Sequence, residues 1–406
     1  MLTSPEQIAH AAFVETFGAA PLVAGRAPGR VELLGNHTDY NGGLVLAAAI
    51  DRATVVVGRA VPGVEARVRS ANLGGTDTYS PAGLHPSAGA GDDSWGRYVR
   101  GVTWAVGQAA GPIRGGFEAA LAGDVPIGAG LSSSASLQAA FALFLAGADL
   151  ATIPGANDAG GPDRLALAQT LRRSENEFVG VASGLLDQFS VLFGRADHAF
   201  ILDCLTLDHE LLPLGHPAPA IVVCDSKTSR RLADGMYNVR RAECERVVEY
   251  FRARRPDAPV RFLRDVTLDG LLDDWDALDP VGRLRARHVL TENDRVARGA
   301  EVLKAGDVRA FGALMSASHA SSRDDFANSS PALDALIAAA EASPGFLGGK
   351  LSGAGWAGCT VNLVEPDRAE AFAEAVRAGY AARTGLVPDV HICHAADGAS
   401  SRPLDA

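Results

Sequence analysis

A run of glycines and hydroxyl residues stands directly before a long apolar segment, and this junction most restricts how the chain folds. Residues 126–136 read Pro-Ile-Gly-Ala-Gly-Leu-Ser-Ser-Ser-Ala-Ser, and residues 137–146 read Leu-Gln-Ala-Ala-Phe-Ala-Leu-Phe-Leu-Ala. The apolar segment has no Pro or Gly and is long enough for about three helical turns. The serines therefore fall where the first N–H groups of a helix have no partner inside the helix.

This junction is typical of a phosphate-binding loop. Glycine lets the backbone approach a ligand closely, and a helix N-terminus carries partial positive charge. A hydroxyl at the helix start can also reach a magnesium ion held by the same phosphates. The loop residues concerned are Gly128, Ala129, Gly130, Leu131, Ser132, Ser133 and Ser134. On this stretch alone, a flexible loop that merely caps the helix is an equally good interpretation, and the usual nucleotide loop Gly-x-x-x-x-Gly-Lys-[Ser/Thr] does not occur in the sequence.

Length, charge and cysteine content narrow the class of protein. The 406 residues exceed the ~250–300 residues at which single cores stop growing, so two domains are expected. The net charge of −11 argues against general nucleic-acid binding and against binding to anionic membranes. The five cysteines include no Cys-x-x-Cys pair, which favours buried thiols in a reducing compartment. The sequence begins without a signal-peptide pattern and contains no apolar run of roughly 18 residues or more, so a cytoplasmic protein is predicted.

Strand-like runs alternate irregularly with helical segments, which favours an α+β fold over a doubly wound sheet. In the first half, strands are predicted over residues 53–58, 66–69 and 115–121, and helices over 95–108, 137–146 and 164–178. In the second half, strands are predicted over 220–224, 359–364 and 389–393, and helices over 234–254, 281–304, 308–319, 331–342 and 369–384. Residues 71–94 and 152–163 read as surface loops. A Pro-rich stretch near residues 205–218 predicts two domains, 1–207 and 208–406.

A second motif brings charged and aromatic residues close together. Residues 27–46 read Ala-Pro-Gly-Arg-Val-Glu-Leu-Leu-Gly-Asn-His-Thr-Asp-Tyr-Asn-Gly-Gly-Leu-Val-Leu. A solvated turn between two strands would explain Asn41-Gly42-Gly43. It does not explain why Arg30, His37, Asp39 and Tyr40 cluster ahead of the turn.

The Gly-Arg-Val-x-Leu-x-Gly-x-His-Thr-Asp-Tyr-Asn-x-Gly pattern of this motif resembles the galactokinase signature. The loop at 126–136 resembles the phosphate loop of the wider small-molecule kinase family that includes homoserine, mevalonate and phosphomevalonate kinases (the GHMP kinases). Residues 348–360, Gly-Gly-Lys-Leu-Ser-Gly-Ala-Gly-Trp-Ala-Gly-Cys-Thr, look like the C-terminal glycine motif of that family. The resemblance covers essentially the whole chain. It implies an N-terminal domain similar to the second domain of ribosomal protein S5, a ferredoxin-like C-terminal domain and an active site in the cleft between them.

The resemblance also implies roles for the reacting groups. Asp187, in Ser183-Gly-Leu-Leu-Asp-Gln-Phe189, matches the catalytic aspartate, which can accept the proton of a sugar hydroxyl. Arg30 matches the active-site arginine, which would keep Asp187 ionised and stabilise charge on the attacking oxygen or the transferred phosphoryl group. Ser134 and Glu175 match the residues that bind Mg²⁺, an ion that prefers oxygen ligands. Glu177 is expected to face solvent instead.

Sugar and nucleotide contacts are implied for a further set of positions. The expected sugar-binding residues are Asn36, His37, Asp39, Gly184 and Tyr237, and ATP is expected on the loop from Gly128 to Ser134. Trp95 lies in a segment that resembles the family's region near the adenine, although a core tryptophan is an equally good interpretation.

Two positions depart from the family pattern. Galactokinases typically carry glutamate immediately before the histidine, where this chain has Asn36, and they often carry asparagine where it has Glu32. Asparagine can both donate and accept hydrogen bonds and has no charge. Asn36 therefore suits galactose, but it would also admit a sugar with a carboxylate at C6. Glu32 and Asn36 can also be interpreted together, as an exchange of glutamate and asparagine between the two positions.

The resulting hypothesis is an ATP- and Mg²⁺-dependent kinase that phosphorylates the C1 hydroxyl of a sugar, with D-galactose favoured. Galacturonate or N-acetylgalactosamine is the alternative substrate. A non-catalytic galactose and ATP sensor is a less favoured alternative, because the serine-rich loop, Arg30, Glu175 and Asp187 are all present. The expected partners are the sugar and ATP, without nucleic acid or membrane, in a monomer or weak homodimer.

Overall fold

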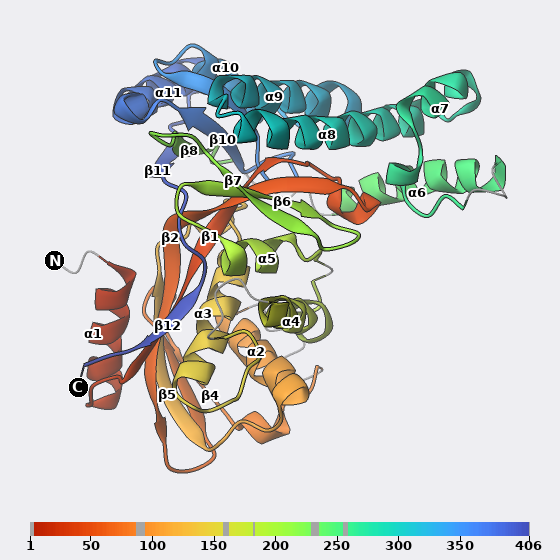
Figure 1. Cartoon of the computed structure of the whole chain (residues 1–406). Coiled ribbons are helices and arrows are strands. Elements are labelled where there is room, and N and C mark those ends of the chain that lie inside the picture. The colour runs from red at the N-terminus through yellow and green to blue at the C-terminus, as the bar shows by residue number, and fades with distance from the viewer. Residues whose placement is uncertain are drawn as a thin grey trace.

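The computed structural model describes residues 4–86, 94–156, 162–181, 183–228, 235–254 and 259–405 of the chain. The strands of this described part form two sheets, one of eight strands and one of four (Figure 1). The eight-stranded sheet has the order β12-β1-β2-β5-β3-β4, with β6 and β7 added beside β2. The four-stranded sheet has the order β11-β8-β10-β9.

A long antiparallel hairpin, β1 (Val23–Leu34) and β2 (Leu44–Val61), forms the centre of the first sheet. The β-branched residues Thr54, Val55, Val56 and Val57 suit the extended backbone of β2. The sheet continues on one side through β5 (Gly116–Gly123), β3 (Ala66–Ser70) and β4 (Thr76–Tyr79). At the start of β2 it is extended by β6 (His198–Asp203) and β7 (His209–Pro213).

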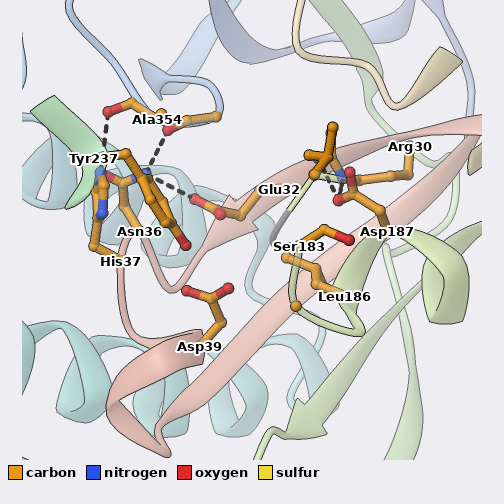
Figure 2. Close-up of a pocket in the computed structure, with 13 residues that line it drawn as sticks. Arg30, Glu32, Asn36, His37, Asp39, Ser183, Leu186, Asp187, Tyr237 and Ala354 are labelled. Carbon is orange, nitrogen blue, oxygen red and sulfur yellow. Dashed lines mark hydrogen bonds and ion pairs between the residues drawn. The ribbon is translucent and has the colours of Figure 1, made fainter. Parts of the chain in front are cut away.

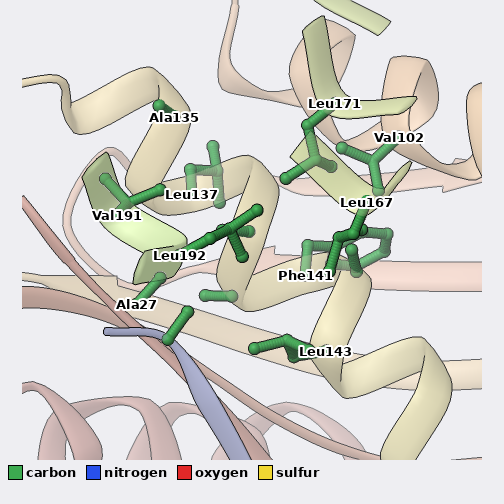
Figure 3. Close-up of a cluster of buried hydrophobic side chains, with 14 of the residues drawn as sticks. Ala27, Val102, Ala135, Leu137, Phe141, Leu143, Leu167, Leu171, Val191 and Leu192 are labelled. Atoms are coloured by element: carbon green, nitrogen blue, oxygen red, sulfur yellow. The ribbon is translucent and has the colours of Figure 1, made fainter. Parts of the chain in front are cut away.

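Helices cover both faces of the first sheet. Helices α2 (Trp95–Ala110), α3 (Ser133–Gly147), α4 (Pro162–Arg173) and α5 (Leu186–Phe193) lie on one face, and α1 (Pro5–Phe17) lies on the other (Figure 1). Helix α3 is buried all round from Ala135 to Leu145, as expected for a helix that is apolar on every side. Figure 3 shows its Leu137, Phe141 and Leu143 packed among side chains of the neighbouring elements. This packing fixes the serine-rich N-terminus of α3.

The second sheet contains the antiparallel strands β8 (Ala220–Asp225), β9 (Phe346–Leu351), β10 (Cys359–Val364) and β11 (Asp389–Cys393). Helices α8 (Pro280–Lys304), α9 (Val308–Ser321), α10 (Pro331–Glu341) and α11 (Ala369–Thr384) accompany it. Helices α6 (Met236–Arg254) and α7 (Leu268–Asp273) lie beside the part of α8 that extends away from the second sheet (Figure 1). No helix in the described ranges is long and apolar enough to cross a membrane.

One of the buried apolar clusters joins the two halves of the chain. A single buried cluster combines Leu33 and Leu46 of the central hairpin with Val361 of the second sheet and Phe311 of α9. In addition, β12 (Ser400–Pro403) returns to pair with β1 at the edge of the first sheet. The turn between β1 and β2 is therefore held directly against the second half of the chain.

The α+β prediction is confirmed, and the other predicted strands and helices are present with shifts of a few residues at their ends. The strand predicted over residues 53–58 is much longer than expected, because it is the second half of β2, which begins at Leu44. Two local predictions were wrong. Residues 71–94 are not entirely loop, because Thr76–Tyr79 pair with β3 as strand β4; residues 87–93 lie outside the described ranges. The helix expected to continue to Phe178 changes at Ser174 into a π-helix, η3 (Ser174–Val179). The boundary after residue 207 stays a prediction; strand pairing passes from the first sheet to the second between Pro213 and Ala220.

Candidate active site

A cavity of about 290 Å³ lies where the β1–β2 turn meets the second half of the chain. All five expected sugar-binding residues line it: Asn36, His37, Asp39, Gly184 and Tyr237. The two expected catalytic residues, Arg30 and Asp187, line it as well (Figure 2). The structure thus brings together side chains from β1, from the turn after it, from the segment before α5, and from α6.

Arg30 and Asp187 form an ion pair at the cavity wall. Arg30 Nε and Nη2 both donate to Asp187 Oδ1, at 2.9 and 2.5 Å. Arg30 Nη1 donates to the carbonyl oxygen of Gly130 in the glycine loop. Within the described residues no hydrogen bond engages Asp187 Oδ2, and this carboxylate remains about one-third exposed. One oxygen of Asp187 is therefore fixed by the guanidinium while the other can accept a proton from a bound molecule.

The glycine loop has the backbone of an anion-binding turn. Gly128, Gly130 and Ser132 all have positive φ, at 78°, 76° and 58°. Buried Ala129 and Leu131 anchor the loop between them. Ser132 provides no side-chain cap for α3, so the first N–H groups of this helix are available to an anion.

A second cavity, of about 330 Å³, opens on the helix side of this loop. Ser133 and Ser134 line it together with Trp95 and Tyr98 of α2. The expected nucleotide residues Trp95 and Ser134 are therefore brought to one cavity. Its further walls are largely apolar, with Leu73, Val125 and Leu137, which suits a flat aromatic ring.

The expected metal-binding pair lies next to the loop. Ser134 Oγ donates to Glu175 Oε1 at 3.2 Å, and Ser183 Oγ donates to Glu175 Oε2 at 3.0 Å. Burial, followed by the neighbouring charge of Asp187, raises the pKa of Glu175. Among the described residues there is no cluster of three or more His, Cys, Asp or Glu side chains placed to hold a metal ion. Ser134 and Glu175 still offer two oxygen donors, the type of ligand that Mg²⁺ prefers.

Glu177 faces away from this pair, as expected. It is half exposed and pairs with Arg173 one helical turn earlier. The π-helix from Ser174 to Val179 contains both glutamates, but it buries Glu175 and leaves Glu177 at the surface.

His37 and Asp39 differ strongly in charge state. Burial lowers the pKa of His37 to about 3, so its ring is neutral, with Nε2 3.0 Å from the Ala354 carbonyl oxygen and Nδ1 2.9 Å from the Tyr40 hydroxyl. Burial, and then the nearby carboxylates of Glu32 and Asp187, raise the pKa of Asp39 to about 6. A Cβ at Gly184 would lie 2.9 Å from Asp39 Oδ2, so glycine there lets the α5 segment close over Asp39.

Comparison with known proteins identifies the family. The galactokinase galactose-binding signature matches residues 11–60, and the N- and C-terminal domains of GHMP kinases match residues 97–195 and 300–382. A galactokinase from Roseiflexus sp. is 42% identical over 95% of this chain and 94% of its own length, and the human galactokinase is 38% identical over 96% and 95%. The chain belongs to the galactokinase family.

Solved structures agree with the galactokinase assignment. The structure of Lactococcus lactis galactokinase complexed with galactose superposes with a TM-score of 0.83, at 32% identity, and covers 96% of this chain and 98% of that one. A mevalonate kinase from Methanococcus jannaschii, at 15% identity, superposes with a TM-score of 0.64 over 92% of this chain and 98% of its own and so shares the fold. The resemblance stated from the sequence is confirmed.

Two buried residues that the sequence analysis did not single out hold the turn between β1 and β2 from behind. Glu292 Oε1 accepts hydrogen bonds from the backbone N–H groups of Gly35 and Asn36, at 2.8 and 3.2 Å. His288 Nε2 lies 3.0 Å from the Asn36 carbonyl oxygen. Both residues lie on α8 and are fully buried. The one available signal was a carboxylate, Glu292, on the buried face of an otherwise amphipathic helix. That signal does not indicate that its partners, Gly35 and Asn36, lie more than 250 residues away.

Charge stabilises this buried support. Burial opposes ionisation of Glu292, but Arg295, His288 and Lys350 lower its pKa to about 2. Arg295 Nε donates to Glu292 Oε2 at 2.7 Å, and Ser318 Oγ donates to Oε1 at 2.7 Å. The ionised carboxylate therefore satisfies two backbone donors, a hydroxyl and a guanidinium at once.

Replacing Glu292 by Gln should destabilise the protein, because it leaves the partly buried Arg295 without its counter-charge. We expect the free energy of unfolding at pH 7 to fall by about 3 kcal/mol, measured by urea denaturation. Since the folded pKa of about 2 lies below the ordinary value of 4.5, the difference should be complete above pH 4.5 and shrink as the pH falls toward 2. Glu301→Gln, an exposed position on the same helix, is the matched control; equal stabilities of the two variants would contradict the account.

Proposed function

We propose that this galactokinase-family protein transfers the terminal phosphoryl group of ATP to the C1 hydroxyl of D-galactose. The observation that carries the proposal is the Arg30–Asp187 pair, which lines the polar cavity and is hydrogen-bonded to the glycine loop through Gly130. An acceptor hydroxyl in the cavity and a phosphate on the loop would therefore meet at one carboxylate. The relatives named galactokinase, and the related structure that holds galactose, support galactose as the sugar.

Asp187 is assigned the role of base. The sugar hydroxyl oxygen attacks the terminal phosphorus, its proton passes to Asp187 Oδ2, and the bond to the bridging oxygen of ADP breaks. Arg30 holds the other carboxylate oxygen and stabilises negative charge that spreads over the transferred group. Phosphoryl transfer needs positioning and charge stabilisation more than covalent chemistry, which matches a site built from one fixed ion pair.

The nucleotide is assigned to the loop and the second cavity. Backbone N–H groups from Gly128 to Ser134 would bind phosphate oxygens at the N-terminus of α3. Trp95 would form a wall against the adenine ring. Ser134 and Glu175 would hold Mg²⁺, which when bound neutralises charge on the phosphates. The sugar is assigned to His37, Asp39, Gly184 and Tyr237, with neutral His37 and the Asp39 carboxylate as hydrogen-bonding groups.

We also propose a cytoplasmic monomer or weak homodimer that needs neither nucleic acid nor membrane. The net charge of −11 supports the absence of a polyanionic partner. The five cysteines are all free thiols, and four of them are buried, which suits a reducing compartment.

Replacing Asp187 by Asn should lower kcat by about 10²–10⁴-fold, because the amide cannot accept the proton. ATP affinity should change little, because the glycine loop is intact. The measurement is ADP release with ATP and Mg²⁺ in the presence of galactose, galacturonate, N-acetylgalactosamine, glucose or arabinose. Asp276→Asn, at a fully exposed carboxylate, is the control and should behave as the unchanged protein. If the unchanged protein released no ADP with any of these sugars, the kinase proposal would be refuted and a sensor would be favoured.

Replacing Glu175 by Gln should raise the Mg²⁺ concentration needed for half-maximal activity by roughly ten-fold, because one charged oxygen ligand is lost. Glu177→Gln, two residues away at the surface, should leave this concentration unchanged. The measurement is a magnesium titration of initial rates at saturating ATP and sugar. Equal magnesium requirements for the two variants would remove Glu175 from the metal site.

A further inference from the structure

Glu32, Asn36 and Lys350 form a connected polar group in the cavity wall (Figure 2 shows Glu32 and Asn36). Lys350 Nζ donates to Glu32 Oε1 at 2.8 Å, and Asn36 Nδ2 donates to the same oxygen at 3.3 Å. Glu32 and Asn36 line the cavity, whereas the Lys350 side chain is fully buried behind them. The group therefore joins the first sheet to β9 of the second.

Asn36 uses its hydrogen-bonding capacity within the protein. Its amide nitrogen donates one hydrogen to Glu32 and the other to the Gly353 carbonyl oxygen at 2.8 Å. Its amide oxygen accepts from Asn328 Nδ2 at 2.8 Å and from Ser322 Oγ at 3.4 Å. The acceptors on one side and the donors on the other also fix the orientation of the amide. A sugar hydroxyl could reach Asn36 only by replacing one of these contacts.

Glu32 is different, because one of its oxygens is free. Both of its internal bonds end on Oε1, and within the described residues no hydrogen bond engages Oε2. Glu32 lies two residues after Arg30 on β1, so both side chains point to the same face of the strand, and both line the cavity. The carboxylate thus offers one acceptor oxygen to a molecule bound there.

We propose that Glu32, and not Asn36, is the side chain that selects the sugar, by accepting a hydrogen bond from a neutral hydroxyl and repelling a carboxylated sugar. Lys350 and Asn36 act as positioning residues that fix the Glu32 carboxylate. The carboxylates of Asp39 and Asp187 line the same cavity, against the single guanidinium of Arg30. The negative charge of a carboxylated sugar would therefore meet three carboxylates. This inference rests on the proposed sugar kinase function.

The test compares sugar binding by variants at the two positions. Glu32→Gln alone leaves the buried Lys350 without a counter-charge, so Glu32→Gln is combined with Lys350→Met to keep the wall neutral. Dissociation constants for galactose and galacturonate are measured by calorimetry without ATP, and kcat and KM are measured with ATP and Mg²⁺. Thermal unfolding monitors folding of each variant.

For Glu32→Gln/Lys350→Met we expect galactose affinity to fall by about ten- to hundred-fold, the loss typical of one charge-assisted hydrogen bond. We also expect the preference for galactose over galacturonate to shrink by at least ten-fold. Asn36→Ala should lower the melting temperature but keep galactose affinity within a few-fold, since Asn36 makes no bond to the sugar and Lys350 still holds the Glu32 carboxylate. Glu118→Gln, which removes another part-buried, ion-paired carboxylate outside the cavity lining, should alter neither galactose affinity nor the preference for galactose over galacturonate.

The proposal is overturned if the folded Glu32→Gln/Lys350→Met variant binds galactose like the unchanged protein, or if Asn36→Ala loses affinity while that variant does not. Failure of the kinase proposal has a different signature. The unchanged protein would then bind galactose in a Glu32-dependent way but release no ADP with any sugar.

Discussion

The guanidinium of Arg30 is the interaction on which the arrangement of the site depends. It bonds twice to Asp187 and once to the Gly130 carbonyl, while the Arg30 backbone N–H donates to the Leu131 carbonyl at 3.1 Å. One residue thereby holds the Asp187 carboxylate and the glycine loop in fixed positions relative to each other. Arg30 pairs with Ala49 of β2, and β12 pairs with the earlier residues Val23 to Arg26 of the same strand. The sheet therefore holds Arg30 in place. A site for phosphoryl transfer needs this rigidity, because it works mainly by positioning.

The part of the cavity wall formed by the turn between β1 and β2 depends on contacts between the two halves of the chain. The backbone of Gly35 and Asn36 is bonded to Glu292 and His288 of α8. Asn36 and His37 also reach the glycine motif after β9, at Gly353 and Ala354. His37 has a φ of 60°, a conformation that a non-glycine residue holds only when its surroundings determine it. The buried ionic group around Glu292 therefore supports the wall of the cavity although Glu292 itself does not line it.

Much of this could be predicted from the sequence, because the motifs are local. Three segments each indicate a chemical role within a few residues: the loop before α3, the His-Thr-Asp-Tyr segment and the segment around Asp187. These segments lie together in the structure. The role of each remains a prediction until it is tested.

Glu292, His288 and Lys350 could not be found this way, because their partners at the cavity wall lie more than 250 residues distant and no periodicity marks them. The hydrogen bonds of the Asn36 side chain could not be predicted either. The sequence identifies the residue as asparagine but does not show which four atoms its amide contacts. The strand at Thr76–Tyr79 was missed because its pairing with β3, rather than its composition, makes it a strand.

The most direct test of the central claim is a double-mutant cycle on kcat with Arg30→Met, Asp187→Asn and the combined variant. If Arg30 acts with Asp187 as one unit, removing the second residue adds little once the first is gone. The account predicts that the combined variant is within about three-fold of the slower single variant, with all three proteins folded. A combined loss equal to the product of the two single losses would contradict it, because Arg30 and Asp187 would then act independently.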